Sequence, residues 1–257
     1  MDLTTLRVDV ADFVATVTID RPPVNALSNE MIDELTRTFD AFSDRDDVRA
    51  VVLTAAGKVF CAGADIKARA GKTFADGERW DYNRAIREMF LVFMECKKPV
   101  IAALNGPAIG GGVAMAACCD ILLAAENAYM ALNEINVGLL GGSRHAMRLF
   151  GHSKLRRMMF TGHQVTGPEL YRLGVVEACT APDQLLPTAL AMAAEIAEKS
   201  PVAIKLGKLA INTIEDLSLR DGYRFEQEMT AQLAGYEDSK EAMRAFLERR
   251  KGNFTGR

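Results

Sequence analysis

Several features that would place this chain in a specialised class are scarce or absent. Its 257 residues include five cysteines and one tryptophan, and the formal net charge is only −3. Without an excess of basic residues, no global field favours nucleic acid. No apolar run reaches the roughly 20 residues that a membrane span needs, and no secretory leader precedes Leu6. We therefore expect no membrane association, with the cytoplasm as the compartment.

The cysteines exclude two further kinds of site. Cys118 and Cys119 are adjacent, the other three are scattered, and no CxxC or Cys/His spacing occurs. A disulfide framework or a metal centre would need such spacing. We expect the five thiols to be buried apolar side chains in a reducing compartment, and we expect no metal site.

What the sequence does contain is enough apolar residues for one folded core, because 49% of the chain is hydrophobic. Short apolar runs such as Val48–Thr54 and Val100–Leu104 predict buried strands, and helical patterns lie between them. This alternation predicts an α/β fold.

Four local predictions follow from the same patterns. Ser28 is the predicted N-cap of a helix that continues to about Ser43. A second helix is predicted at Arg144–Phe150, and a strand at Val175–Ala178. The polar segment Ala70–Gly77, which contains two glycines, is a candidate mobile flap.

The densest turn chemistry lies in Asn105–Asp120, which reads NGPAIGGGVAMAACCD. Three glycines precede a run of small apolar residues, which predicts a helix that begins against a packed neighbour. Glycines let another group approach the backbone, and the free N–H groups at a helix start suit an oxyanion. Taken alone, such a turn is equally compatible with close packing and no other role.

A second glycine-containing turn, Phe60–Lys67 (FCAGADIK), follows the predicted strand Val48–Thr54. Two turns that each offer one N–H group make an oxyanion hole where they converge. Together FCAGADIK and NGPAIGGG resemble the paired signatures of the crotonase (enoyl-CoA hydratase/isomerase) superfamily. The resemblance extends from RPPVNAL near the start to AFLERRKGNF near the end.

The resemblance implies a crotonase-type spiral of ββα units over residues 1–200, followed by a C-terminal helical trimerisation region over residues 201–257. It implies a homotrimer or hexamer that acts on an acyl-CoA thioester. Coenzyme A would be part of the substrate, and no separate cofactor is expected. In the family two backbone N–H groups bind the thioester carbonyl, and these positions fall on Ala64 and Gly111.

The chain departs from the family at one of two glutamates that hydratases commonly use. The first position is Ala114 here, whereas the second matches Glu134 in ALNEINVGL. Water addition is easiest to explain with two carboxylates, but a 1,3-shift of a double bond needs only one base. The Leu-Asn-Glu run also resembles the Δ3,Δ2-enoyl-CoA isomerase branch. The sequence therefore favours isomerisation, with hydration as the alternative.

Two side chains near this site have competing interpretations. Glu134 is either the acid/base or a surface carboxylate, and its apolar neighbours favour the first because burial raises a carboxyl pKa. His145 follows a segment that departs from many relatives. It is either a second acid/base near the acyl group or a structural hydrogen-bonding residue. Asp120 matches a family aspartate and is expected to be structural. Phe90 is expected in the core or at the border of the acyl pocket.

The resemblance also implies contacts with coenzyme A. Lys67 is expected near the nucleotide. A basic residue near the C-terminus of the same or a neighbouring subunit matches Arg249, with Phe246 beside it. Further contacts, mainly from the backbone, would come from Val24, Ala62, Asp65 and Ile66.

An RNA-binding protein is the alternative from a different class, because some crotonase relatives bind RNA through basic surfaces. The stretch Arg144–Arg157 carries basic side chains at seven positions, namely Arg144, His145, Arg148, His152, Lys154, Arg156 and Arg157. The negative net charge and the lack of interleaved aromatic residues count against this reading. No nucleic-acid partner is expected.

Overall fold

The computed structural model describes residues 3–69, 73 and 75–257. The strands are β1 (Leu6–Ala11), β2 (Val14–Ile19), β3 (Ala50–Ala55), β4 (Val100–Leu104), β5 (Ala108–Ile109), β6 (Ile121–Ala125), β7 (Tyr129–Ala131), β8 (Val165–Thr166) and β9 (Ala178–Thr180). The helices are α1 (Asn29–Asp44), α2 (Ile66–Arg69), α3 (Glu78–Glu95), α4 (Gly111–Ala117), the 3₁₀ turn η1 (Glu134–Val137), α5 (Ser143–Ala146), α6 (His152–Thr161), α7 (Gly167–Arg172), α8 (Leu185–Ala197), α9 (Pro201–Ile214), α10 (Leu219–Leu233) and α11 (Glu237–Glu248).

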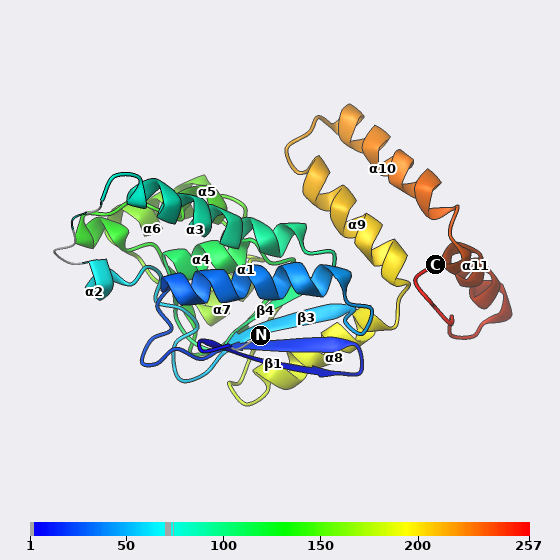
Figure 1. The fold of residues 1–257 in the computed structure, drawn as a ribbon, viewed down its shortest axis with the longest axis horizontal. Coiled ribbons are helices and arrows are strands. Elements are labelled where there is room, and N and C mark those ends of the chain that lie inside the picture. Colours follow the sequence, from blue (N-terminus) through cyan, green and yellow to red (C-terminus); the bar gives the residue numbers. More distant parts are fainter. Residues whose placement is uncertain (1–2, 70–72, 74) are drawn as a thin grey trace.

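A six-stranded sheet in the order β1-β2-β3-β4-β6-β9 forms the centre of the fold. The hairpin β1–β2 is antiparallel, and the other neighbours are parallel. Every residue of β3 and β4 is buried, as parallel strands covered on both faces require. Helix α8 packs on one face of this sheet, and α1 lies over the other (Figure 1). The predicted α/β architecture is confirmed.

Helix α1 forms as its sequence predicts. The Ser28 hydroxyl accepts a hydrogen bond from the Met31 N–H at 3.3 Å, so the predicted N-cap is confirmed. The apolar face of α1 is buried, and it meets α3 through Phe39, whose ring centroid lies 4.6 Å from that of Phe93 in an edge-on contact. The α1–α3 pair forms a layer above the turns that carry the candidate site.

A small sheet in the order β5-β7-β8 holds the second glycine turn in place. Strand β5 pairs in parallel with β7, and the Gly110 N–H donates to the Ala131 carbonyl at 2.9 Å. Because β7 leads directly into η1, this pairing sets the position of Glu134 relative to Gly110. The short sheet therefore connects the glycine turn to the candidate base.

Two local predictions were wrong in extent. The helix predicted at Arg144–Phe150 forms only α5, and the following N–H groups of Arg148 and Leu149 bond three residues back in tightened turns. The strand predicted at Val175–Ala178 begins only at Ala178, because that residue is the first to pair with β6. The flap predicted at Ala70–Gly77 includes residues 70–72 and 74, which lie outside the described residues.

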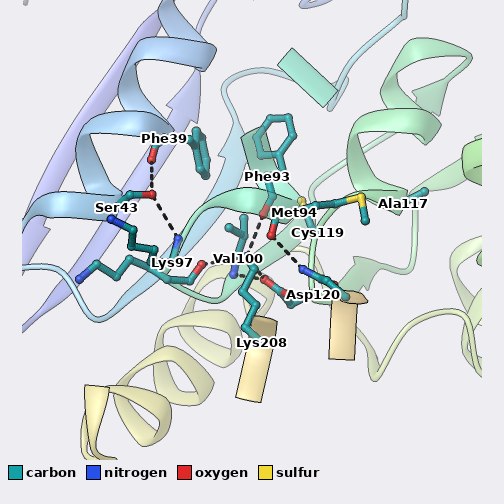
Figure 2. Close-up of polar contacts among 12 residues, drawn as sticks. Phe39, Ser43, Phe93, Met94, Lys97, Val100, Ala117, Cys119, Asp120 and Lys208 are labelled. Carbon is teal, nitrogen blue, oxygen red and sulfur yellow. Dashed lines mark hydrogen bonds and ion pairs between the residues drawn. The ribbon is translucent and has the colours of Figure 1, made fainter. Parts of the chain in front are cut away.

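The C-terminal helices α9, α10 and α11 extend away from the sheet (Figure 1). A buried lysine nevertheless anchors α9 to the core: Lys208 Nζ lies 2.7 Å from an Asp120 carboxylate oxygen and donates to the Phe93 carbonyl at 2.8 Å (Figure 2). The same Asp120 oxygen accepts the Val100 N–H at 2.7 Å. The structural role expected for Asp120 is confirmed. The division at residue 200 stays a prediction.

Candidate active site

The first turn of the candidate site is built around Gly63. Its φ of +80° lies in the left-handed region, and a Cβ atom there would stand 2.7 Å from the Ile109 carbonyl oxygen and 3.0 Å from the Gly111 nitrogen. Only glycine fits, because no side-chain carbon is tolerated at these distances. The turn after β3 therefore packs backbone to backbone on the turn after β5.

The second turn meets the first at three consecutive glycines. A Cβ atom on Gly111 would stand 2.7 Å from Leu27 Cδ1 and 3.8 Å from the Ala64 nitrogen, and one on Gly112 would stand 2.4 Å from the Cys61 carbonyl oxygen. A β-bridge between Leu27 and Ala64 holds the first turn at the same place. The two segments predicted to carry the N–H donors are thus direct neighbours.

Neither proposed donor has an acceptor among the described residues. The hydrogen bonds there include none that the Ala64 or the Gly111 N–H group donates. Gly111 is the first residue of α4, so its N–H has no acceptor inside the helix. Two adjacent unpaired N–H groups on rigid turns are the components of an oxyanion hole.

Glu134 lies directly beside this pair of turns. A Cβ atom on Gly110, whose φ is +53°, would stand 2.6 Å from Glu134 Oε1, so the carboxylate occupies the space that this glycine leaves open. The other oxygen, Oε2, is buried without a hydrogen-bond partner among the described residues. Burial raises the pKa of this half-buried carboxyl. The surface-carboxylate interpretation does not fit this placement.

Ala114, the position at which a second carboxylate is absent, is fully enclosed. Ala114 lies in the middle of α4 with only 1% of its surface exposed, and its N–H donates to the Gly110 carbonyl at 3.1 Å. The position therefore belongs to the same helix turn that offers the Gly111 N–H. The Glu134 carboxylate faces Gly110.

His145 packs against an aromatic side chain of α3. Its half-buried imidazole lies 4.9 Å from the Phe90 ring, centroid to centroid, at an interplanar angle of 54°. Burial lowers the pKa of His145, and the nearby guanidinium groups of Arg144 and Arg148 lower it further. All three effects favour the neutral form of the ring.

The segment that precedes α1 is bound to the first turn by a charged pair that sequence reasoning missed. Arg21 donates to the Asp65 carboxylate at 2.8 Å and to the Ala26 carbonyl at 3.0 Å. Asp65 also accepts the Ala68 N–H, and these two contacts hold the pKa of its carboxyl below the ordinary value. The spacing of residues in the sequence does not predict the contact between Arg21 and the Ala26 carbonyl. The Arg-Pro-Pro turn does indicate a fixed conformation at this point.

The remaining residues expected to contact coenzyme A fall into two groups. Val24 and Ala62 bond to each other, since the Ala62 N–H donates to the Val24 carbonyl at 3.1 Å, and Lys67 is exposed on α2 with Ile66. Phe246 and Arg249 form the second group. They are exposed on and just after α11, at the opposite end of the molecule from α2 (Figure 1). The contact of either group with coenzyme A stays a prediction.

A cavity of about 670 Å³ lies between α1, α2 and α3. It shares Leu27 and Asp65 with the first turn, and its lining carries Arg21 as well as carboxylates from Glu30, Asp33, Glu78, Asp81 and Glu88. Ion pairs balance part of this charge, because Arg21 pairs with Asp65, Arg37 with Asp33 and Arg84 with Asp81.

Other site types find little support in the described residues. No group of three or more His, Cys, Asp or Glu side chains among residues 3–69, 73 and 75–257 could hold a metal ion. All five cysteine thiols are free, and four of them are buried. No helix in the described part of the chain is long and apolar enough to cross a membrane.

Three of the seven basic side chains behind the RNA-binding alternative, those of Arg144, Arg148 and Lys154, are paired with carboxylates. Lys154 lies 2.6 Å from Glu169, and Arg148 lies 2.8 Å from Glu215. Paired charges of this kind do not form an open phosphate-binding surface.

The fold and the paired turns define the class as an acyl-CoA enzyme of the crotonase superfamily. A sequence model described as "Enoyl-CoA hydratase/isomerase" matches residues 9–257. The chain belongs to the enoyl-CoA hydratase/isomerase family and is an enzyme of that family.

Relatives and solved structures agree with this assignment over the full length. A "Probable enoyl-CoA hydratase" of Rhizobium meliloti is 37% identical over 261 aligned positions, covering 100% of both chains. The "Short-chain-enoyl-CoA hydratase" of Clostridium acetobutylicum is 35% identical and covers 98% of this chain and 97% of its own. The crystal structure of an enoyl-CoA hydratase from Bacillus anthracis superimposes with a TM-score of 0.93 at 30% identity, covering 99% of this chain and 100% of that one.

Proposed function

We propose that this enzyme stabilises the enolate of an acyl-CoA thioester at the N–H groups of Ala64 and Gly111, with Glu134 as the acid/base. The observation that carries the proposal is the placement of the Glu134 carboxylate against Gly110, the residue before one of the two donors. A thioester oxygen held by both N–H groups would direct its α-carbon toward that carboxylate. Removing one such donor typically costs about 2.7–4 kcal/mol of barrier.

The favoured reaction is migration of a double bond from the 3-enoyl to the 2-enoyl position. Glu134 would take a proton from C2, the oxyanion hole would stabilise the resulting dienolate, and the same carboxyl group would return the proton at C4. One base completes this cycle without a second carboxylate. The buried Ala114 supports the proposal, because no carboxylate stands at that position to orient water.

Hydration of a 2-enoyl thioester is the second candidate. The relatives named above carry hydratase names, and that naming favours water addition. If both reactions occur, we expect hydration to be the slower one, because the chain lacks the second carboxylate. Acyl-chain length and pathway are left open.

Assembly and location complete the proposal. We propose a homotrimer or hexamer in which Phe246 and Arg249 of one subunit reach the coenzyme A moiety that Lys67 of another subunit contacts. The exposure of Phe246, at 83% of its surface, supports a role in contacts outside its own chain. The cytoplasm is the proposed compartment, which suits five free thiols.

The test is a panel of 2-enoyl and 3-enoyl thioesters assayed both for water uptake and for double-bond migration. Wild type should isomerise 3-enoyl substrates faster than it hydrates crotonyl-type substrates. Ala114→Glu should raise hydration more than isomerisation. Rapid hydration by wild type without any isomerisation would replace the favoured reaction with the second candidate.

A further inference from the structure

Helix α5 runs alongside α4, and two contacts set their alignment. A Cβ atom on Gly142, just before α5, would stand 3.3 Å from the Gly110 carbonyl oxygen, just before α4. Beyond the end of α5, Arg148 Nη1 donates to the carbonyl of Ala117, the last residue of α4, at 2.5 Å. The segment that contains α5 therefore meets α4 near its start and, through the long Arg148 side chain, at its last residue.

His145 and Ala114 each follow the Gly142–Gly110 contact on their own helix. His145 is three residues after Gly142, and Ala114 is four residues after Gly110, so each is about one helical turn beyond the shared contact. The space beside Gly142 is also close to the candidate base, since a Cβ atom there would stand 3.7 Å from Glu134 Oε1. His145 follows Gly142 by three residues, on the short helix α5 that begins there.

The surroundings of the imidazole leave its ring nitrogens available. One side of the ring contacts Phe90 of α3. No hydrogen bond to either ring nitrogen occurs within the described residues. The charged groups near it are Arg144 and Arg148, and the second of these is paired with Glu215.

We propose that His145 takes the place of the absent carboxylate at Ala114 and activates the water that adds to a 2-enoyl thioester. This inference rests on the proposed function, because it assumes an acyl-CoA held at Ala64 and Gly111 with Glu134 at its α-carbon. It explains how a chain with one active-site glutamate belongs to a family whose named relatives are hydratases.

The proposed step balances as follows. The neutral imidazole accepts a proton from water, and the water oxygen forms a bond to C3 of the substrate. The C2–C3 π pair moves to C2 as the thioester enolate, and protonated Glu134 gives its proton to C2. The imidazolium proton then returns to Glu134 through solvent, so the net change is addition of one water molecule. Isomerisation uses Glu134 alone.

The two reactions therefore depend differently on His145. The experiment measures hydration of crotonyl-CoA and isomerisation of a 3-enoyl-CoA for wild type, His145→Gln and His145→Phe. His152→Gln, which changes an exposed histidine at the start of α6, is the matched control. We expect both His145 variants to lose about 10²–10⁴-fold in hydration while they retain isomerisation, because a general base typically contributes that much. The control should retain both activities.

Four outcomes would overturn the inference. Hydration that survives in both variants would show that another group activates water. Equal loss of hydration and isomerisation in His145→Gln, the less disruptive variant, would show that His145 is structural. Isomerisation by wild type without any hydration would remove the water-activating role but leave the proposed function standing. If wild type showed neither reaction, the proposed function would fail and the inference with it.

Discussion

At the scale of single residues, Glu134 is the group on which the proposed chemistry depends. Glu134→Gln keeps the shape of the side chain but removes the base. Isomerisation should fall by about 10²–10⁴-fold in kcat with little change in KM, because binding at the two N–H groups is untouched. Steady-state kinetics with a 3-enoyl-CoA would measure this. Glu177→Gln, an exposed carboxylate elsewhere, is the control; a Glu134 variant as active as this control would exclude the role.

The same carboxyl group predicts how isomerisation depends on pH. Burial raises the pKa of Glu134 above its ordinary value of 4.5. Only the deprotonated form takes a proton from C2, so activity is present above the folded pKa and is lost as pH falls through it. The acid limb of kcat/KM should therefore lie above pH 4.5. A limb at or below 4.5 would mean that the titrating group is solvated like a surface carboxylate.

At the scale of the elements, the Asp120–Lys208 pair connects α9 to the ends of α3, β4 and β6. The Lys208 side chain is only 5% exposed, and burial raises the pKa of Asp120 while the Lys208 ammonium opposes that rise. Lys208→Met would leave Asp120 buried without its cation. Breaking a buried pair from one side typically costs about 3–5 kcal/mol.

Urea denaturation would measure that loss in the free energy of unfolding. The control is Lys205→Met, which removes an exposed lysine from the same helix and should change stability by less than about 0.5 kcal/mol. Similar stabilities for the two variants would mean that the buried pair contributes nothing to the attachment of α9.

The elements also show where sequence reasoning succeeds and where it stops. Helix α1 was predictable because its cap and its apolar face are both local signals. The helix predicted at Arg144–Phe150 was too long, since the side chain of Arg148 is recruited to the end of α4, a contact no local pattern carries. Strand β9 starts late for a similar reason, because its pairing with β6 sets its limits.

Sequence reasoning likewise predicted one part of the candidate site and missed another. Ala64, Gly111 and Glu134 follow from motifs, and the structure places all three around Gly110 and Gly63. The alignment of α5 with α4 depends on contacts between segments more than 30 residues apart, so it was not predictable from the sequence.

At the scale of the whole molecule, the C-terminal helices expose large apolar side chains. Leu219 of α10 is 92% exposed, and Leu247 of α11 is 81% exposed. Such surface favours burial against other subunits. Size-exclusion chromatography with light scattering at micromolar concentration should give a trimer or hexamer. A monomer would remove the proposed contribution of Phe246 and Arg249 to another subunit's coenzyme A site.

The most direct test of the central claim is a crystal structure of the enzyme with a bound saturated acyl-CoA. We predict that the thioester oxygen lies about 2.7–3.2 Å from the backbone nitrogens of both Ala64 and Gly111. We predict that the Glu134 carboxylate faces C2 of the acyl group. A thioester bound elsewhere, or two amides that face different cavities, would contradict the account.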